Sequence, residues 1–178
     1  MPLPSTITRL VEDFRDAKTA AELAVEPARV LFIEDIFRKN LILSAASLYE
    51  HRISEVLIQH TETNANSSDC VIALIKIKAL KRQYHTFFDW DHMKIGPFFS
   101  LLGSTRGDVL KSECANLPTK ECANAFLELG SLRNSLVHRN FALFQCDKTS
   151  EEIISLCEMA EVFVLRVESL LVTSPVTS

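Results

Sequence analysis

A long stretch without helix breakers dominates the sequence. From Ala28 to about His60 the chain contains no glycine and no proline. At about 1.5 Å per residue this stretch predicts one helix roughly 48 Å long. Its apolar residues recur every three or four positions, as they do on an amphipathic helix. The whole chain of 178 residues has only 4 glycines and 6 prolines, and short alternating runs are absent. The predicted fold class is therefore all-α.

The same spacing predicts further helices along the chain. Thr149 followed by Glu152 forms a capping box, which marks the start of the last one. Trp90 and the apolar residues of 98–102 are expected to cover one end of the helical bundle. The predicted long helices run from Ser5 or Thr6 to about Leu23, from Cys70 to about Phe88, from about Lys120 to Phe141 and from Thr149 to about Val172.

Length, charge and cysteine usage describe one intracellular domain. Residues 1–178 are expected to form a single domain with a short polar tail at 173–178. The net charge of -4 excludes a generally basic nucleic-acid-binding protein. The five cysteines are scattered without a CxxC pair, which favours free thiols in a reducing compartment. No signal peptide and no membrane span is predicted, so the expected location is the cytoplasm.

Basic residues nevertheless gather in one short segment. Lys76, Lys78, Lys81 and Arg82 lie within seven positions of an otherwise acidic chain. Such a run is usually the solvated face of a helix. The alternative is a patch that faces RNA phosphates, with Lys78, Lys81, Arg82 and also Arg139 as its candidate residues.

The common enzymatic motifs are absent. The histidines and cysteines show neither zinc-ligand spacing nor an HExxH pattern, and no glycine-rich phosphate loop is present. We therefore predict no metal and no cofactor. What remains is LELGSLRNSLVHRNFALF at 127–144, an apolar helical stretch that carries Arg133, Asn134 and His138. Polar groups of this kind are unfavourable in a core unless they reach the surface or form a site.

These three residues suit the cleavage of RNA. Arginine presents a fixed fork of donors that matches a phosphate, and histidine exchanges a proton near neutral pH. Asn134 lies one turn before His138, where its amide can orient the imidazole or hold an oxygen. Arg133 and His138 would suffice for a metal-free reaction in which the ribose 2′-OH attacks the adjacent phosphorus.

The spacing of Arg133 and His138 presents a difficulty. Positions five apart on a straight helix differ by about 140° around its axis, so the two side chains do not share a face. Either the helix unwinds or bends near His138, or two copies of the chain line one cleft across a two-fold axis. The alternative is that Arg133 forms a salt bridge with Glu50 or Glu128 and that His138 is an ordinary surface residue.

The segment LRNSLVHRNF, late in a helical chain, resembles the HEPN superfamily. Its signature is an arginine, a polar residue and, a few positions later, a histidine. LSAASLYEHRI in the long helix and the spacing of Trp90, Phe98, Phe99 and Gly103 look like the RiboL-PSP-like HEPN domains. The resemblance covers most of the chain from about Ala28 to Leu171. It implies a HEPN-like helical bundle with a core of four to five helices plus short accessory helices.

The resemblance also implies an activity. It points to a metal-independent endoribonuclease that acts as a homodimer and leaves a 2′,3′-cyclic phosphate and a 5′-OH. Carried over to this chain, Arg133 and His138 are catalytic, Asn134 is the polar residue after the arginine, and Glu50 is an acidic residue facing the pocket. Many members are toxins or antiviral defence proteins, so RNA and a cognate antitoxin or defence partner are implied. Other members keep the fold without activity, which leaves a non-catalytic nucleotide- or protein-binding module as the alternative.

Overall fold

The structure is a computed structural model that describes residues 3–64, 69–80, 83–139 and 141–172. Within these ranges all regular elements are helical, and the only bridge is an isolated one between Asp89 and Lys94. The all-α prediction is confirmed. The α-helices are α1 (Ser5–Leu23), α2 (Pro27–Asn64), α3 (Asp69–Leu74), α4 (Gly96–Leu101), α5 (Gly103–Cys114), α6 (Thr119–His138) and α7 (Ser150–Val172). A π-helix, η1 (Ile75–Leu80), and two 3₁₀ helices, η2 (Tyr84–Thr86) and η3 (Phe141–Leu143), complete the order.

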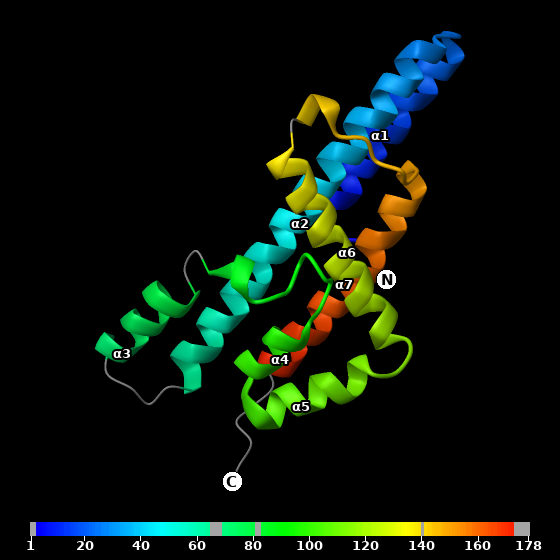
Figure 1. The fold of residues 1–178 in the computed structure, drawn as a ribbon. Helices are drawn as coiled ribbons and strands as arrows, with labels where there is room; N and C mark the ends of the chain where they lie inside the picture. The colour runs from blue at the N-terminus through cyan, green and yellow to red at the C-terminus, as the bar shows by residue number, and fades with distance from the viewer. Residues whose placement is uncertain (1–2, 65–68, 81–82, 140, 173–178) are drawn as a thin grey trace.

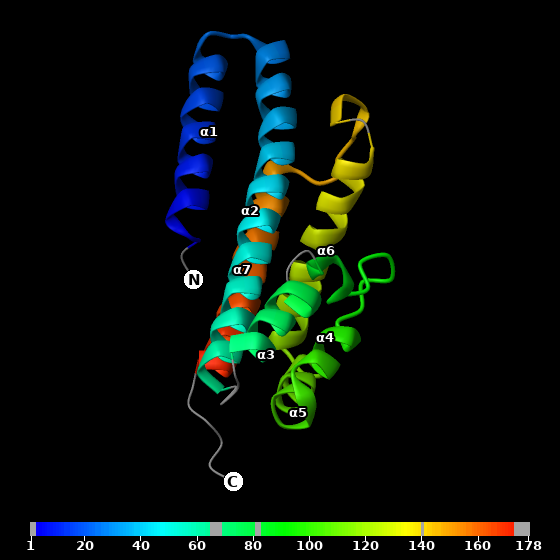
Figure 2. The ribbon, with the colours of Figure 1, turned by 90° about the vertical axis from the view of Figure 1, so that its left-hand side faces the viewer.

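Helix α2 is the element against which α1, α6 and α7 pack (Figure 1). Its contacts with α7 advance in the same direction along both helices, so the two run parallel. Tyr49 Oη donates to the carbonyl oxygen of Cys157 at 2.8 Å, and His60 Nδ1 lies 2.8 Å from that of Leu171. Figures 1 and 2 show α6 running in the opposite direction beside them.

Helices α1 and α2 form a hairpin that extends beyond the rest of the bundle (Figure 2). The rings of Phe14 and Phe37 stack between the two helices, with centroids 3.7 Å apart. Near the turn of the hairpin Leu23 and Val25 are largely exposed. The hairpin is therefore stabilised by packing between α1 and α2 along their length, as at Phe14 and Phe37, while the apolar side chains at its turn stay exposed.

A cluster of aromatic rings joins the segment after η2 to α6 and α7. The ring of Phe88 lies 4.8 Å from Phe98, 4.9 Å from Trp90 and 5.0 Å from Phe126, measured between centroids. Phe126 in turn lies 5.0 Å from Phe163 of α7. Phe98 is fully buried and Trp90 is nearly so. The predicted apolar cover over the bundle is thus present, and it fixes Trp90 against α6.

The prediction of a single helix from Cys70 to Phe88 is wrong. Helix α3 ends at Leu74, the π-helix η1 follows, and the chain then turns through η2. Phe87 and Phe88 are both buried although they are neighbours in sequence. The turn brings both rings into the core, and this long-range packing overrides a weak local helix preference.

Helix α6 ends at His138, three residues before the predicted end at Phe141. Arg139 already has an extended backbone, with φ of -103° and ψ of 163°. The reason is tertiary, because the Phe141 ring lies 5.2 Å from the ammonium of Lys39. That ammonium is buried and lies 2.7 Å from an Asp35 carboxylate oxygen. The chain leaves the helix to reach this cation on α2.

Other helix ends differ in smaller ways. Helix α1 begins at Ser5 directly after Pro4, and neither Ser5 nor Thr6 caps it through a side-chain hydrogen bond, although the sequence allows either residue to do so. Helix α2 continues beyond His60 to Asn64. The capping box is confirmed, since Glu152 Oε2 accepts hydrogen bonds from Thr149 N at 2.7 Å and Thr149 Oγ1 at 2.8 Å. The predicted tail at 173–178 lies outside the described residues.

An ion pair between α5 and α7 is expected to make stability depend on pH. Arg166 donates from Nε and Nη2 to the two Glu113 carboxylate oxygens at 2.7 and 2.6 Å, which lowers the pKa of Glu113 below its ordinary value of 4.5. A carboxyl with a lowered folded pKa stabilises the fold above its unfolded pKa, and this contribution is lost as pH falls through the folded pKa. Glu113→Gln should therefore lower the free energy of unfolding at neutral pH by on the order of 1 kcal/mol.

Urea denaturation of both proteins at a series of pH values measures this effect. The difference between the native chain and Glu113→Gln should shrink as the pH falls below 4.5. A difference that stays constant down to strong acid would show that the pair does not carry the pH dependence.

Candidate functional site

A pocket of about 240 Å³ lies between α2, η2 and α6. Its walls combine aromatic rings with polar groups from α2, η2 and the last turns of α6. The lining residues are Ala46, Tyr49 and Glu50 of α2, Tyr84 and His85 of η2, Trp90, and Phe126, Leu129, Gly130, Arg133 and Asn134 of α6. Three of the sequence-predicted site residues, Glu50, Arg133 and Asn134, therefore meet at one pocket.

Arg133 connects the two other predicted residues at this pocket. Its Nη2 lies 3.5 Å from Glu50 Oε2, and its Nη1 donates to Asn134 Oδ1 at 3.1 Å. The side chains of Arg133 and Glu50 keep 34% and 36% of their surface exposed. The guanidinium is thus oriented by two acceptors and still reaches solvent, where its remaining N–H groups can meet an anion.

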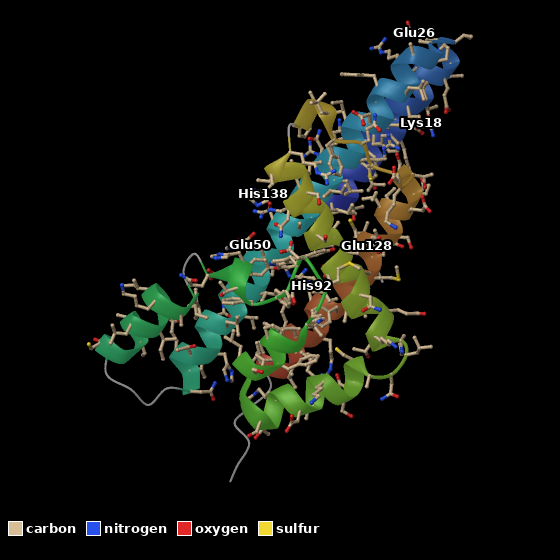
Figure 3. All side chains as sticks on the ribbon, viewed as in Figure 1. Lys18, Glu26, Glu50, His92, Glu128 and His138 are labelled. Carbon is tan, nitrogen blue, oxygen red and sulfur yellow. The ribbon has the colours of Figure 1, made fainter. Side chains whose placement is uncertain are left out.

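His138 occupies a different position in the single chain. It is exposed in the last turn of α6 and does not line the pocket. Figure 3 shows it near the end of α6, with Glu50 on the middle part of α2. Helix α6 ends at His138, which agrees with the first of the two explanations for the five-residue spacing, a helix that unwinds near His138. Even so, one copy of the chain does not bring Arg133 and His138 to the same pocket.

Both features of the non-functional alternative also occur in the single chain. Arg133 pairs with Glu50, and His138 is exposed. Glu128 is not the partner of Arg133, because its Oε1 lies 2.7 Å from the ammonium of Lys148. The catalytic roles of these residues therefore remain predictions.

The sequence did not identify the aromatic half of the pocket. Tyr84 and His85 follow the basic run without a motif that marks them, and Trp90 was expected only to cover one end of the bundle. Burial raises the pKa of the Tyr84 phenol well above its ordinary value, and the Glu50 carboxylate acts in the same direction while Arg133 opposes it. The hydroxyl of Tyr84 therefore stays protonated beside the charged pair.

The predicted basic patch is only partly within the described residues. Lys78 is exposed in η1, and Arg139 is exposed directly after α6. Lys76 pairs with Glu62, which leaves less of its charge for a ligand. Lys81 and Arg82 lie outside the described residues. A groove of about 500 Å³ between α2 and η1 shares Glu50 and Tyr84 with the pocket, so the two hollows adjoin.

In the described ranges, no group of three or more His, Cys, Asp or Glu side chains is arranged to hold a metal ion. Across the same described ranges, none of the helices combines the length and the apolar character needed to cross a bilayer. All five cysteines have free thiols.

Gly130 lets the Trp90 ring lie directly against α6. A Cβ atom at this position would come 2.0 Å from Trp90 Cζ3. Glycine to alanine in a helix otherwise stabilises it by about 1 kcal/mol, but here the contact is far shorter than any real one. We therefore expect Gly130→Ala to lower the free energy of unfolding by about 1–3 kcal/mol through overpacking.

Urea denaturation followed by the emission of Trp90 measures this loss, because Trp90 is the only tryptophan in the chain. Asn124→Ala is the matched control, since Asn124 is exposed on the same helix. A Gly130→Ala protein as stable as the control would contradict the close packing of Trp90 on α6.

Comparison with known proteins agrees with the motif around Arg133. A family model described as RiboL-PSP-HEPN matches residues 7–173. No curated protein and no solved structure matches the chain significantly. The resemblance that the motif and the long second helix indicated is thus confirmed over nearly the full sequence. The chain belongs to the RiboL-PSP-HEPN family.

Proposed function

We propose that the protein is a metal-independent endoribonuclease that works as a homodimer. HEPN domains are often ribonucleases, and they commonly bind RNA and dimerise. The observation that carries the proposal is the state of Arg133 at the mouth of the pocket. Its guanidinium is oriented by Glu50 and Asn134 and remains one-third exposed, as a phosphate-binding arginine needs to be.

The proposed reaction uses two kinds of side chain. His138 takes the proton from the ribose 2′-OH, and the 2′ oxygen forms a bond to phosphorus. The bond from phosphorus to the 5′ oxygen breaks, and this oxygen leaves as a hydroxyl after it receives a proton from a protonated imidazole. Arg133 donates to the phosphate oxygens while their negative charge increases. The products are a 2′,3′-cyclic phosphate and a 5′-OH.

A second copy of the chain would complete the site. His138 does not line the pocket of its own chain, yet it is exposed at the end of the helix that carries Arg133. A two-fold axis near this helix end would place His138 of the partner subunit across from Arg133. The imidazole that has taken the 2′-OH proton can then protonate the leaving oxygen, so one Arg133 and one His138 of the partner subunit make a complete site.

The test is cleavage of labelled RNA by the purified protein in EDTA. We expect Arg133→Ala and His138→Ala each to lower the cleavage rate by about 10²- to 10⁴-fold, with unchanged circular dichroism. His51→Ala is the control, because His51 is exposed on α2 and does not line the pocket. Persistent cleavage by both variants would refute the proposal. Expression in bacteria adds a cellular readout, with toxicity expected for the native chain and not for His138→Ala.

Two further roles belong to this proposal. The exposed cations Lys78 and Arg139 would contact RNA phosphates beside the pocket, together with Lys81 and Arg82. A toxic ribonuclease also needs restraint, so a cognate antitoxin or defence partner is proposed as a second binding partner.

A non-catalytic module is the second candidate function. It is favoured by one observation, namely that within a single chain Arg133 is already paired and His138 does not line the pocket. A module of this kind would bind a nucleotide or a protein without turnover. Binding of RNA with no cleavage, and with equal affinity for the native chain and His138→Ala, would support it.

A further inference from the structure

The walls of the pocket offer aromatic surface to a flat ligand. Tyr84 and Trp90 both line it, with ring centroids 5.7 Å apart, and the Phe88 ring lies 4.9 Å from that of Trp90. Tyr49 contributes mainly its ring, because its hydroxyl donates to the Cys157 carbonyl oxygen at 2.8 Å. Unstacked RNA bases are commonly held on such aromatic side chains.

The size of the pocket suits one small ring system. Its volume of about 240 Å³ is below the roughly 300 Å³ at which pockets for drug-sized ligands begin. The absence of a side chain at Gly130 lets the Trp90 ring close directly against the α6 backbone. The compartment that remains has room for a single nucleobase.

The polar edge of the pocket has a defined donor and acceptor pattern. Glu50 presents a carboxylate, which keeps lone pairs beyond the one directed at Arg133. Asn134 accepts from Arg133 through Oδ1 at 3.1 Å, so its amide N–H groups remain as donors. A double acceptor therefore lies beside donors along the same rim.

Guanine is the base whose edge complements this pattern. Its Watson–Crick edge carries two N–H donors next to one carbonyl acceptor. Adenine pairs a single amino donor with a ring acceptor, and in uracil one donor lies between two acceptors. Cytosine has one donor followed by two acceptors, so only guanine offers a carboxylate two neighbouring donors. We propose that the pocket is a nucleobase subsite that selects guanine, with Glu50 accepting its two donors and Asn134 donating to its carbonyl oxygen.

The subsite adjoins the proposed phosphate-binding position. Arg133 touches both Glu50 and Asn134, so a guanine held by these two residues would lie beside the guanidinium, and the phosphate bound by Arg133 would belong to a nearby nucleotide of the same RNA. The inference that this guanine belongs to an RNA chain rests on the proposed ribonuclease function. It implies that cleavage occurs next to guanosine, while binding of the base can be measured without any cleavage.

The test uses the full-length protein and the four nucleoside 5′-monophosphates. Trp90 lines the pocket and is the only tryptophan in the chain, so its emission reports binding, with calorimetry as a second measurement. We expect guanosine monophosphate to bind about tenfold or more tightly than the other three. Glu50→Gln, which is nearly isosteric, should weaken guanosine monophosphate about tenfold and remove the preference. Glu158→Gln is the control, since Glu158 is exposed on α7 and should bind as the native chain does.

Each outcome decides the inference. Equal binding of all four nucleotides, no binding, or an unchanged preference in Glu50→Gln would overturn the guanine subsite. Guanine-selective binding without cleavage of RNA would leave the subsite standing and refute the ribonuclease proposal. Cleavage of RNA together with unselective binding would refute the guanine subsite and leave the ribonuclease proposal standing. Tyr84→Leu, which fills the same region without an aromatic ring, should also weaken guanosine monophosphate, and an unchanged affinity would contradict stacking.

Discussion

Mixing the Arg133→Ala and His138→Ala variants is expected to restore RNA cleavage that neither variant has alone. In the proposed dimer, Arg133 of one chain acts with His138 of the partner subunit. A mixed dimer contains one chain with an intact arginine and one with an intact histidine, so one of its two sites is complete. If the chains exchange freely, half of the dimers are mixed and roughly a quarter of the native activity returns.

This experiment separates the two solutions to the five-residue spacing. If the end of α6 alone brings Arg133 and His138 of one chain together, the mixed dimer contains no intact pair and activity stays absent. Cleavage assays on an equimolar mixture, after the chains have been allowed to exchange, measure the difference. Each variant mixed with buffer in place of its complement gives the baseline. No recovery in a mixture shown to contain mixed dimers would refute the shared site.

Replacing Arg52 is expected to destabilise the fold more than any other single change discussed for this chain. Arg52 Nη1 donates to both oxygens of Glu161 at 2.8 and 2.6 Å, and Nε and Nη2 donate to Glu168, both at 2.7 Å. Glu161 is only 5% exposed. Arg52→Ala would leave the Glu161 carboxylate buried without a counterion, which lowers the free energy of unfolding by about 3–5 kcal/mol.

Urea denaturation provides the measurement, and two comparison proteins sharpen it. Arg9→Ala removes a surface pair at 4.0 Å, in which the Arg9 side chain is 83% exposed, and should change stability by less than about 0.5 kcal/mol. Arg52→Ala combined with Glu161→Leu should recover part of the loss, because the buried charge disappears with its partner. A loss below about 1 kcal/mol in Arg52→Ala would show that Glu161 is solvated or paired by another route.

The helical architecture was largely predictable because it is encoded locally. A helix hydrogen-bonds between residues four apart, so the apolar spacing of 28–60 and the capping box at Thr149 and Glu152 identify α2 and α7 without tertiary information. Helix ends were less predictable, because they respond to distant partners. Helix α6 stops at His138 where the chain turns to bring Phe141 to Lys39, about a hundred residues earlier in sequence.

The candidate site was likewise predictable only where it depends on residues that are close in sequence. Arg133, Asn134 and His138 are neighbours on one helix, so their residue types and spacing are visible in the sequence. The pocket is not, because it forms only where η2 and Trp90 pack against α6 and where Arg133 reaches Glu50 on α2. These contacts join segments that are far apart in the chain, and no local pattern records which of them will meet.

The sequence by itself determined the helical class, the family and the polar triplet on α6, since each depends on residues a few positions apart. The tertiary structure alone decided that α3 ends at Leu74, that Gly130 accommodates Trp90, and that Glu50 and Asn134 flank Arg133 at a pocket with aromatic walls. The physical reason is that burial of the aromatic rings outweighs the small local preferences of the segments that carry them. Local sequence patterns report only these small preferences, so they do not predict which distant segments will pack together.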